Sequence, residues 1–463
     1  MSKHTAAEPP SEPTAAEPRM EPTAAEPPAV SGAEAPADAP AAQPIESQVI
    51  ASSPTHRRIL GLDGIRGLGC LAVVVGHVGE FYSPVTHHKA LLDILGLALI
   101  LFFVLSGFLL FLPYVRKLTK PGSAMPDTRQ YFLHRVFRVF PGYVAIFLIC
   151  NFVLRAVFVQ NPTIQQPGSQ HGTGMITEPG ELLANLTLLQ TYIPQYVQTG
   201  INPSWSLTLE IAFYLSLPLL GMLMFALRGR LNVHPLKLAL LAPGILLAVG
   251  YLGRALIPLV YRHVDVYNFA PDGDFQPLEL WLQNWGPNWA AVFSRCLLSN
   301  ADLFAYGMLG AVLFVAIEQG VIGERAAKWI HRVSLIGIPV SGAVTLVLLK
   351  SQSPFGFAAL GVVSGFFIVV VVLPLAWGAD SRLARWLDAR PFYFVGLISM
   401  SVYLWHFPVL LVMGRYGLAA GDSWSGMFRN MALVTVVTLV VSTVTYYGVE
   451  KPGLNQVKRF RKR

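Results

Sequence analysis

The sequence contains little charge and almost no cysteine. Only 13% of its 463 residues are Asp, Glu, Lys or Arg, about half the fraction that is usual in a soluble domain. The apolar fraction is 53% and the mean hydropathy is +0.51, which argues against an ordinary globular enzyme. The three cysteines, Cys70, Cys150 and Cys296, lie within apolar runs, so the sequence predicts neither a disulfide framework nor a zinc site.

Several chemical motifs are absent as well. The sequence has no phosphate-binding Walker loop, no dinucleotide glycine fingerprint, no Gly-x-Ser-x-Gly elbow and no His-Glu-x-x-His pair. Each of these motifs supplies groups that its own chemistry requires. Phosphate-driven and hydride-driven chemistry therefore have no support, and we expect no metal and no bound cofactor.

Large apolar residues are scarce over residues 1–54. A unit beginning Thr-Ala-Ala-Glu-Pro recurs at Thr5, Thr14 and Thr23, and Pro, Ala and Glu dominate. Such a stretch buries too little surface to offset the entropy lost on ordering, so it predicts a disordered tail and not a signal peptide. Two bases and eight acids give the tail a net charge of −6, which leaves +14 for the remaining residues.

From Leu62 onward, long apolar stretches alternate with short polar breaks. Most of them reach the ~20 residues that a helix needs to cross a bilayer. We therefore predict an all-α polytopic membrane protein, with a transmembrane domain over 55–453 and a basic tail over 454–463. The ten predicted spans are 62–82, 91–114, 140–159, 205–227, 236–260, 297–318, 333–350, 355–378, 391–413 and 429–449.

The positive charge is distributed unequally between the two sides of these spans. When ten spans alternate, 23 Lys and Arg residues fall on the side of both termini and eight on the other. Cytoplasmic loops carry the excess of positive charge in membrane proteins, so we predict a multi-pass plasma-membrane protein with both termini in the cytoplasm. The basic balance needs no nucleic-acid partner, and the oligomeric state stays open.

Ionisable side chains inside the spans are costly and mark candidate functional positions. Arg66 and His77 lie eleven residues apart in the first span, which puts them on one helical face ~16 Å apart. Arg66 could reach the cytoplasmic surface, whereas for His77 we weigh function above structure. Glu210 lies near the outer end of the fourth span and shares a face with Ser206 and Tyr214. It could pair with an arginine, meet solvent or take part in chemistry.

The ninth span carries a polar stack. Ser399, Tyr403 and His406 share one face, and Pro408 is expected to kink the helix just after them. Such a stack lines a cavity in many membrane proteins, although a buried structural histidine is an equally simple interpretation.

Two further groups have an ordinary membrane interpretation beside a functional one. Arg135 and Arg138 open the third span one turn apart, where they could anchor the cytosolic interface or hold phosphates. Trp281, Trp285 and Trp289 follow helical spacing in an outer loop. An interfacial aromatic belt is the favoured interpretation, and a stacking platform for sugar rings is the alternative.

Taken together, these segments resemble the integral-membrane acyltransferase-3 family. Six matching pieces occur in the family's order across 57–453, nearly all of the membrane domain. They are Arg66 with His77, Phe102-Phe-Val-Leu-Ser106-Gly107-Phe108, Arg135-x-x-Arg138-x-x-Pro141, Trp205-Ser206-Leu-x-x-Glu210, Tyr403-Leu-Trp405-His406 and Glu450-Lys451-Pro452.

The resemblance implies transfer of an acyl group, often acetyl, from cytosolic acyl-CoA as co-substrate to a hydroxyl of a sugar-containing acceptor. Cell-envelope polysaccharides and glycolipids are acceptors of this kind. Arg66 and His77 match the family's catalytic pair, and Arg135 and Arg138 match its donor-binding arginines. The other matched side chains are expected to line the substrate cavity, among them Trp205, Ser206, Tyr403 and His406.

The residue types suit this chemistry. An alcohol that attacks a thioester needs a general base, and a histidine that titrates near neutrality is well matched to that task. We assign to His77 the role of base or of transient acyl carrier, with Glu210 orienting it or the acceptor hydroxyl. Ser106 or Arg66 would meet the developing oxyanion at the donor site.

A different class of protein stays open as an alternative. A secondary transporter that exports a glycolipid or small molecule would also have many spans and buried charges. We see no convincing inverted repeat, and the ordered motifs favour the enzyme. The separate membrane-bound O-acyltransferase family also uses an intramembrane histidine, but the Arg66 and His77 pair in the first span distinguishes the two.

Overall fold

The structure is a computed structural model, and it describes residues 58–159, 172–262 and 286–460. The predicted tail over 1–54 lies outside the described residues. By its contacts the chain divides into residues 1–57 and residues 58–463, and the description below concerns the second unit. Within the described ranges it is almost entirely helical, as predicted. Strands β1 (Val157–Phe158) and β2 (Thr173–Gly174) form one short antiparallel pair.

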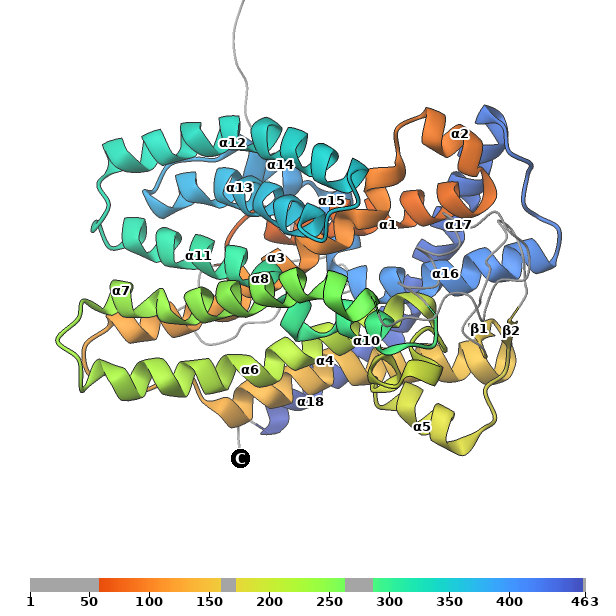
Figure 1. Ribbon diagram of the computed structural model, residues 1–463, viewed down its shortest axis with the longest axis horizontal. Helices are drawn as coiled ribbons and strands as arrows, with labels where there is room; N and C mark the ends of the chain where they lie inside the picture. The colour runs from red at the N-terminus through yellow and green to blue at the C-terminus, as the bar shows by residue number, and fades with distance from the viewer. Residues whose placement is uncertain (1–57, 160–171, 263–285, 461–463) are drawn as a thin grey trace, which may run out of the picture. The chain divides into compact units, whose positions relative to one another are not determined.

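Long helices run side by side through the molecule, with α2, α5 and the two strands gathered at one end (Figure 1). The helices of the first half are α1 (Leu62–Tyr82), α2 (Pro84–Lys89), η1 (Asp93–Ala98), α3 (Leu99–Thr119), α4 (Thr128–Leu148), η2 (Ile149–Val153), α5 (Pro179–Leu186), η3 (Gln190–Tyr192), η4 (Pro194–Tyr196), η5 (Asn202–Ser204) and α6 (Trp205–Arg228). Those of the second half are α7 (Pro235–Ala239), α8 (Leu241–Tyr261), α10 (Trp289–Arg295), η7 (Leu297–Ser299), α11 (Ala301–Glu318), α12 (Glu324–Lys350), α13 (Gly356–Ala376), α14 (Arg382–Leu387), α15 (Arg390–Leu397), α16 (Ser399–Arg415), α17 (Trp424–Thr445), η8 (Tyr446–Glu450) and α18 (Lys451–Phe460).

The prediction of about ten spans is confirmed. In the described ranges, nine helical segments are long and apolar enough to cross a membrane, and the bent pair of α15 and α16 makes a tenth. Even the segment predicted over 333–350 is a 27-residue helix, α12. Part of the predicted basic tail over 454–463 is helical, because α18 continues from η8 to Phe460.

The third predicted span begins too late in the sequence-based assignment. Helix α4 starts at Thr128, where the Asp127 side chain accepts hydrogen bonds from the backbone N–H groups of Arg129 and Gln130. This N-cap satisfies donors that a helix start leaves unpaired. The first turns are too polar for a hydropathy window to include them. Arg135 and Arg138 therefore lie well inside the helix and do not open it.

The ninth span is broken, and the break is not at the expected proline. Helices α15 and α16 meet at 77°, around Ile398. Pro408 lies within α16, which continues as a helix on both sides of it. Backbone that departs from a straight helix at membrane depth is tolerated where it lines a cavity. A sharp change in direction therefore lies before the polar stack, and the kink at Pro408 stays a prediction.

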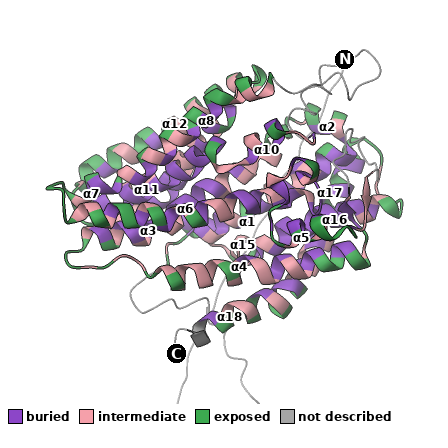
Figure 2. Cartoon of the chain, turned by 60° about the horizontal axis from the view of Figure 1, so that its bottom comes forward, coloured by how far each residue is buried: buried purple, intermediate pink, exposed green. Residues whose placement is uncertain are grey.

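Helix α11 forms the centre of the unit. It is mainly apolar, with the buried Asp302 paired to Arg254 of α8, and 78% of its span is buried, as expected of an enclosed helix. It packs closely against α3, because a Cβ atom on Gly107 would lie 2.0 Å from the Phe304 carbonyl oxygen, and one on Gly307 would lie 1.7 Å from that of Val104. Figure 2 shows exposed residues concentrated on outer helices such as α12, whose span is 11% buried.

Successive long helices end on alternate faces. The Arg228 side chain, at the end of α6, donates to backbone carbonyls at the end of α3 and in the loop after it. Arg116 of α3 pairs with Glu318 at the end of α11 (2.6 Å). We call this side the basic face. At the opposite face, Arg415 at the end of α16 donates to the carbonyl of Leu154, which follows η2 (2.6 Å).

Candidate active site

Two cavities contain most of the polar side chains that the sequence marks inside the spans. The larger, which we call the His77 cavity, has a volume of about 460 Å³. Helices α1, α3, α6, α11, α13 and α16 contribute to its wall, together with η1, η5 and α10. Helices α3, α6 and α11 end at the basic face, and their lining residues lie at the beginnings of the helices or in the segments that precede them. The cavity therefore lies toward the opposite face. Its lining residues are Val73, His77, Gly96, Leu97, Leu99, Ile100, Phe103, Asn202, Pro203, Trp205, Ser294, Arg295, Asn300, Leu303, Phe357 and Tyr403.

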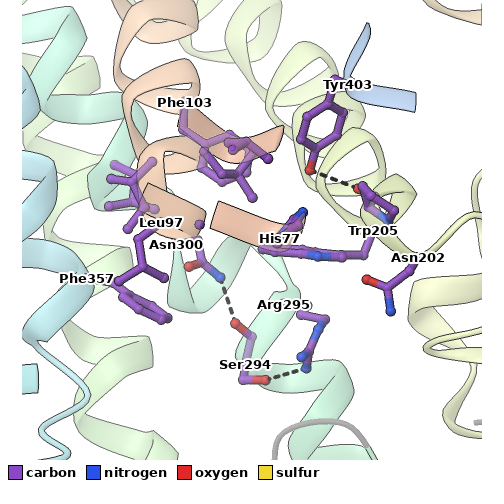
Figure 3. A pocket seen from close by; sticks show the side chains of 16 residues that line it. His77, Leu97, Phe103, Asn202, Trp205, Ser294, Arg295, Asn300, Phe357 and Tyr403 are labelled. Carbon is purple, nitrogen blue, oxygen red and sulfur yellow. Dashed lines mark hydrogen bonds between the residues drawn. The ribbon is translucent and has the colours of Figure 1, made fainter. Parts of the chain in front are cut away.

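The His77 ring lies among polar and aromatic groups. Figure 3 shows it between Phe103, Trp205, Asn300 and Arg295, all of which line the same cavity. An aromatic wall with a few placed polar groups is typical of a small-molecule site.

His77 is held by His406. Its Nδ1 lies 2.8 Å from His406 Nε2, and the two rings are nearly coplanar, at 13°, with centroids 5.1 Å apart. That separation is close to the N···N distance plus the two centroid-to-nitrogen distances, so the rings meet edge to edge. The His406 Nδ1 in turn lies 2.6 Å from the Tyr403 carbonyl oxygen.

The predicted cavity residues of α6 and α16 divide into lining and supporting groups. Trp205 and Tyr403 line the His77 cavity. His406 is fully buried behind His77 and Ser206 is buried beside Tyr403, so neither is part of the wall. The Tyr403 hydroxyl donates to the Pro203 carbonyl (3.1 Å) and accepts from Ser206 (2.9 Å). Ser206 thus fixes the ring that forms the wall.

Arg295 is a cavity residue that the sequence does not single out. It lies in the short helix α10 and is buried. Its guanidinium donates to the Ala291 carbonyl (3.0 Å) and to the Ser294 hydroxyl (3.2 Å), and it lies over the Trp205 ring at 5.6 Å. Burial disfavours its charged form and lowers the pKa of Arg295 to about 9. It is therefore a cation at neutral pH.

The signal for Arg295 was present but ambiguous. In the sequence, Arg295 is one of the few positive charges predicted on the outer side of the spans, and it lies beside an apolar run. The neighbouring residues do not reveal whether such an arginine is buried or solvated. Asn202 and Asn300 were missed for the same reason. Of the three tryptophans, Trp281 and Trp285 lie outside the described residues, and Trp289 is exposed at the start of α10.

The smaller cavity, which we call the arginine cavity, has a volume of about 90 Å³. The Ser106 hydroxyl donates to the Glu210 carboxylate there (2.7 Å). The Arg135 guanidinium lies 5.6 Å from the centroid of the Tyr214 ring. Three arginines and one glutamate leave an excess of positive charge, which suits an anion. Its lining residues are Arg66, Phe102, Ser106, Leu109, Leu110, Arg135, Arg138, Val139, Leu207, Glu210, Tyr214, Ser399 and Met400.

This arrangement bears on two sequence-based assignments. The sequence assigns Glu210 to orient His77 or the acceptor hydroxyl, but its carboxylate lies in the arginine cavity and accepts a hydrogen bond from Ser106. Ser106 and Arg66, the residues expected to meet the oxyanion at the donor site, line the same cavity. Glu210 lies five residues after the start of α6 and beside the middle of α4. The stagger between these helices therefore decides which cavity its carboxylate lines.

The two cavities follow one another along the same four helices. Arg66 and His77 are on α1 and lie ~16 Å apart along its axis. On α3 the neighbours Phe102 and Phe103 line one cavity each. On α6 the residues of the smaller cavity lie two to nine positions after Trp205, and on α16 they lie three and four positions before Tyr403. The arginine cavity is the one nearer the basic face. The four helices therefore connect an arginine-lined end to a histidine-lined end.

Comparisons with known proteins identify a family and several relatives of this chain. The family model described as "Acyltransferase domain" matches residues 59–447. The acyltransferase MdmB of Streptomyces mycarofaciens is 29% identical over 421 residues, 88% of this chain and 95% of MdmB. The O-acetyltransferase OatA of Staphylococcus aureus (strain NCTC 8325 / PS 47) is 22% identical over 373 residues, 78% of this chain and 52% of OatA.

A Bacillus subtilis (strain 168) protein, YrhL, is 22% identical over 414 residues, 86% of this chain and 55% of YrhL. The chain thus spans about half the length of YrhL and OatA. No solved structure matches it.

Proposed function

Because this chain belongs to the acyltransferase-3 family, we propose that it is a membrane O-acyltransferase. It moves an acyl group, acetyl in particular, from cytosolic acyl-CoA to a hydroxyl of a sugar-containing acceptor of the cell envelope. One observation carries the proposal: the same four helices join an arginine-lined cavity to a histidine-lined cavity. An anionic donor and a neutral acceptor need two such environments.

The donor end is the arginine cavity. Arg135 and Arg138 are suited to the phosphates of CoA, because guanidinium groups bind phosphate oxygens in a fork. At about 90 Å³ the cavity is too small for a whole CoA molecule, so the nucleotide would stay toward the basic face. By the positive-inside rule this face is cytoplasmic, which is where acyl-CoA is made available.

The acceptor end is the His77 cavity. Its volume of about 460 Å³ falls in the range of small-molecule sites. The Trp205 ring offers a face for stacking on an apolar sugar face, and the amides of Asn202 and Asn300 can bond hydroxyl groups. This end opens toward the face opposite the basic one, so the acceptor would be engaged on the outer side.

The reaction needs a base and a group that meets the oxyanion. His77 takes the proton of the acceptor hydroxyl as its oxygen attacks the thioester carbonyl. The tetrahedral intermediate collapses, the C–S bond breaks, and the imidazolium returns the proton to the CoA thiolate. Arg295, the cation in the wall of this cavity, would stabilise the oxyanion. If His77 instead carries the acyl group transiently, its imidazole attacks the thioester carbonyl and the C–S bond breaks to release the CoA thiolate. The acceptor hydroxyl then displaces the imidazole from the acyl group, and its proton passes to the thiolate.

A deletion strain tests this function. Mass spectrometry of its envelope glycans and lipids should reveal the loss of an acyl group, which the wild-type gene restores. The His77→Ala variant should not restore it, although it accumulates in the membrane. His331→Ala is the matched control, because His331 is an intramembrane histidine of α12 that bonds the Val370 carbonyl (3.1 Å) and lines neither cavity.

The same strains distinguish acyl transfer from export of an acceptor. Membranes that contain the wild-type protein should transfer label from radioactive acetyl-CoA to an envelope component, and membranes with His77→Ala should not. Movement of an acceptor across the membrane without incorporated label would favour a transporter. Acylation at the wild-type rate by His77→Ala would refute the assignment of the base.

A further inference from the structure

His406 contacts His77 from the protein interior and not from the cavity. It is fully buried, and its two ring nitrogens are both engaged: Nδ1 lies 2.6 Å from the Tyr403 carbonyl oxygen and Nε2 lies 2.8 Å from His77 Nδ1. Among the described residues, those that line the His77 cavity do not include His406. Its contacts can therefore affect the orientation and tautomer of His77, but they do not touch a substrate in the cavity.

These contacts determine where the hydrogens are. A carbonyl oxygen can only accept, so a nitrogen 2.6 Å from it carries the hydrogen. His406 Nδ1 is thus protonated, and in a neutral imidazole the other nitrogen, Nε2, holds a lone pair. That lone pair accepts from His77 Nδ1–H. His77 Nε2 is left with its own lone pair.

The free nitrogen of His77 faces space that a substrate can use. A Cβ atom placed on Gly96 would be 3.7 Å from His77 Cδ2 and 3.9 Å from its Nε2, and Gly96 itself lines the His77 cavity. The absent side chain keeps this edge of the ring uncovered. A hydroxyl in the cavity could therefore reach the unprotonated nitrogen.

We propose that His406 is a positioning residue that holds His77 in the tautomer with Nδ1 protonated and Nε2 free, so that Nε2 is the base. This rests on the proposed function of His77. The acceptor hydroxyl gives its proton to Nε2, and the imidazolium that forms keeps its Nδ1–H bond to His406 until Nε2 returns the proton to the thiolate. In serine hydrolases a carboxylate orients the histidine in this way. Here a neutral imidazole, itself oriented by a backbone carbonyl, does so.

Two amide variants of His406 test the proposal, since they differ in reach by one methylene. His406→Gln places an amide oxygen close to the former Nε2 and can still accept from His77. His406→Asn places its amide close to the former Nδ1 and cannot. With acetyl-CoA and native membranes as the acceptor source, we expect His406→Asn to lower kcat about 100-fold with the KM for acetyl-CoA unchanged. His406→Gln should stay within about tenfold of wild type.

A spectroscopic readout separates this inference from the function. In protein with ¹⁵N-labelled histidine, the signals lost in His77→Gln identify His77, and they should place the hydrogen on Nδ1. In His406→Asn the hydrogen should move to Nε2 in a large part of the molecules. The full chain in nanodiscs is used, and His331→Asn and His331→Gln serve as controls for folding and thermal stability.

Each outcome decides one question. A wild-type kcat in His406→Asn, or equal losses in the Asn and Gln variants, would overturn the positioning role even if His77→Ala is inactive. A His77 hydrogen found on Nε2 in the wild-type protein would also overturn it. If His77→Ala remains active, the proposed role of His77 as the base fails, whereas the ¹⁵N signals still report whether His406 sets the tautomer.

Discussion

The six sequence motifs consist of residues with different physical tasks. His77 and Trp205 line the larger cavity, and Ser106 holds the Glu210 carboxylate in the smaller one. Glu450 is fully buried and accepts a hydrogen bond from Ser401 of α16. Some motif residues thus line a cavity, whereas others fix a neighbouring side chain or helix.

The charges of the arginine cavity carry a testable prediction. Arg138→Gln should raise the KM for acetyl-CoA at least tenfold, since a charge-assisted hydrogen bond contributes about 1.5–3 kcal/mol, and kcat should change less. The dependence of KM on salt concentration should weaken as well. Steady-state kinetics in nanodiscs at two ionic strengths measure both effects.

Arg129→Gln is the matched control for Arg138→Gln. Arg129 is on the same helix, in its first turn, and is exposed, and it lines neither cavity. An equal rise in KM in Arg129→Gln would show that general surface charge, and not the arginine cavity, attracts the donor.

At the scale of elements, the close contact of α3 with α11 sets the geometry of both cavities. The Ser106-Gly107 pair has two roles, because Ser106 bonds Glu210 whereas Gly107 lets the backbone of α11 approach. Helix α16, which begins after the break at Ile398, reaches both cavities. Ser399 and Met400 in its first turn line one, and Tyr403 lines the other.

Gly307→Ala tests the packing of α3 on α11. The added methyl group would lie 1.7 Å from the Val104 carbonyl oxygen, so the helices must separate. We expect a loss of about 1–3 kcal/mol or more in stability, seen as a lower Tm of the detergent-solubilised protein and a lower transfer rate.

Gly310→Ala on the same helix provides the comparison. Its Cβ would meet the Phe108 ring at 3.4 Å and Val369 at 3.7 Å, which are ordinary contacts. Alanine also favours the helix over glycine, so Tm should stay or rise. Equal destabilisation by both variants would mean that the close approach at Gly307 is not what holds α3 to α11.

At the scale of the whole molecule, successive helices end on alternate faces, and the two cavities lie toward different faces. The ends of α3, α6 and α11 meet at the basic face, and the His77 cavity lies toward the other. If the basic face is cytoplasmic, the acyl group is taken up on one side and transferred near the other.

Cysteine labelling tests that orientation. In a background with Cys296→Ser, a cysteine replacing Gly417, after α16, should react with a membrane-impermeant maleimide in intact cells. One replacing Arg230, after α6, should react only after permeabilisation. Cys70 and Cys150 are buried and should stay unlabelled. The inverse pattern would place the basic face outside and contradict a cytosolic donor site.

The order and number of spans follow from the sequence alone. Exposing polar backbone to hydrocarbon is costly, so each span must be a helix that satisfies its own hydrogen bonds. A span can therefore be recognised from the hydropathy of its own residues. Local helix geometry likewise indicates that Arg66 and His77 share a face. The start of α4 did not follow, since an N-cap and polar first turns extend it to Thr128 without changing the apolar window.

Only the tertiary structure decided which polar residues meet. The rotation and stagger of neighbouring helices put Glu210 with the arginines, His406 behind His77 and Arg295 beside Trp205. These settings depend on contacts between segments far apart in the chain, such as the glycine-mediated approach of α3 and α11. A periodic pattern within one helix states which way a side chain points, but not what it will face.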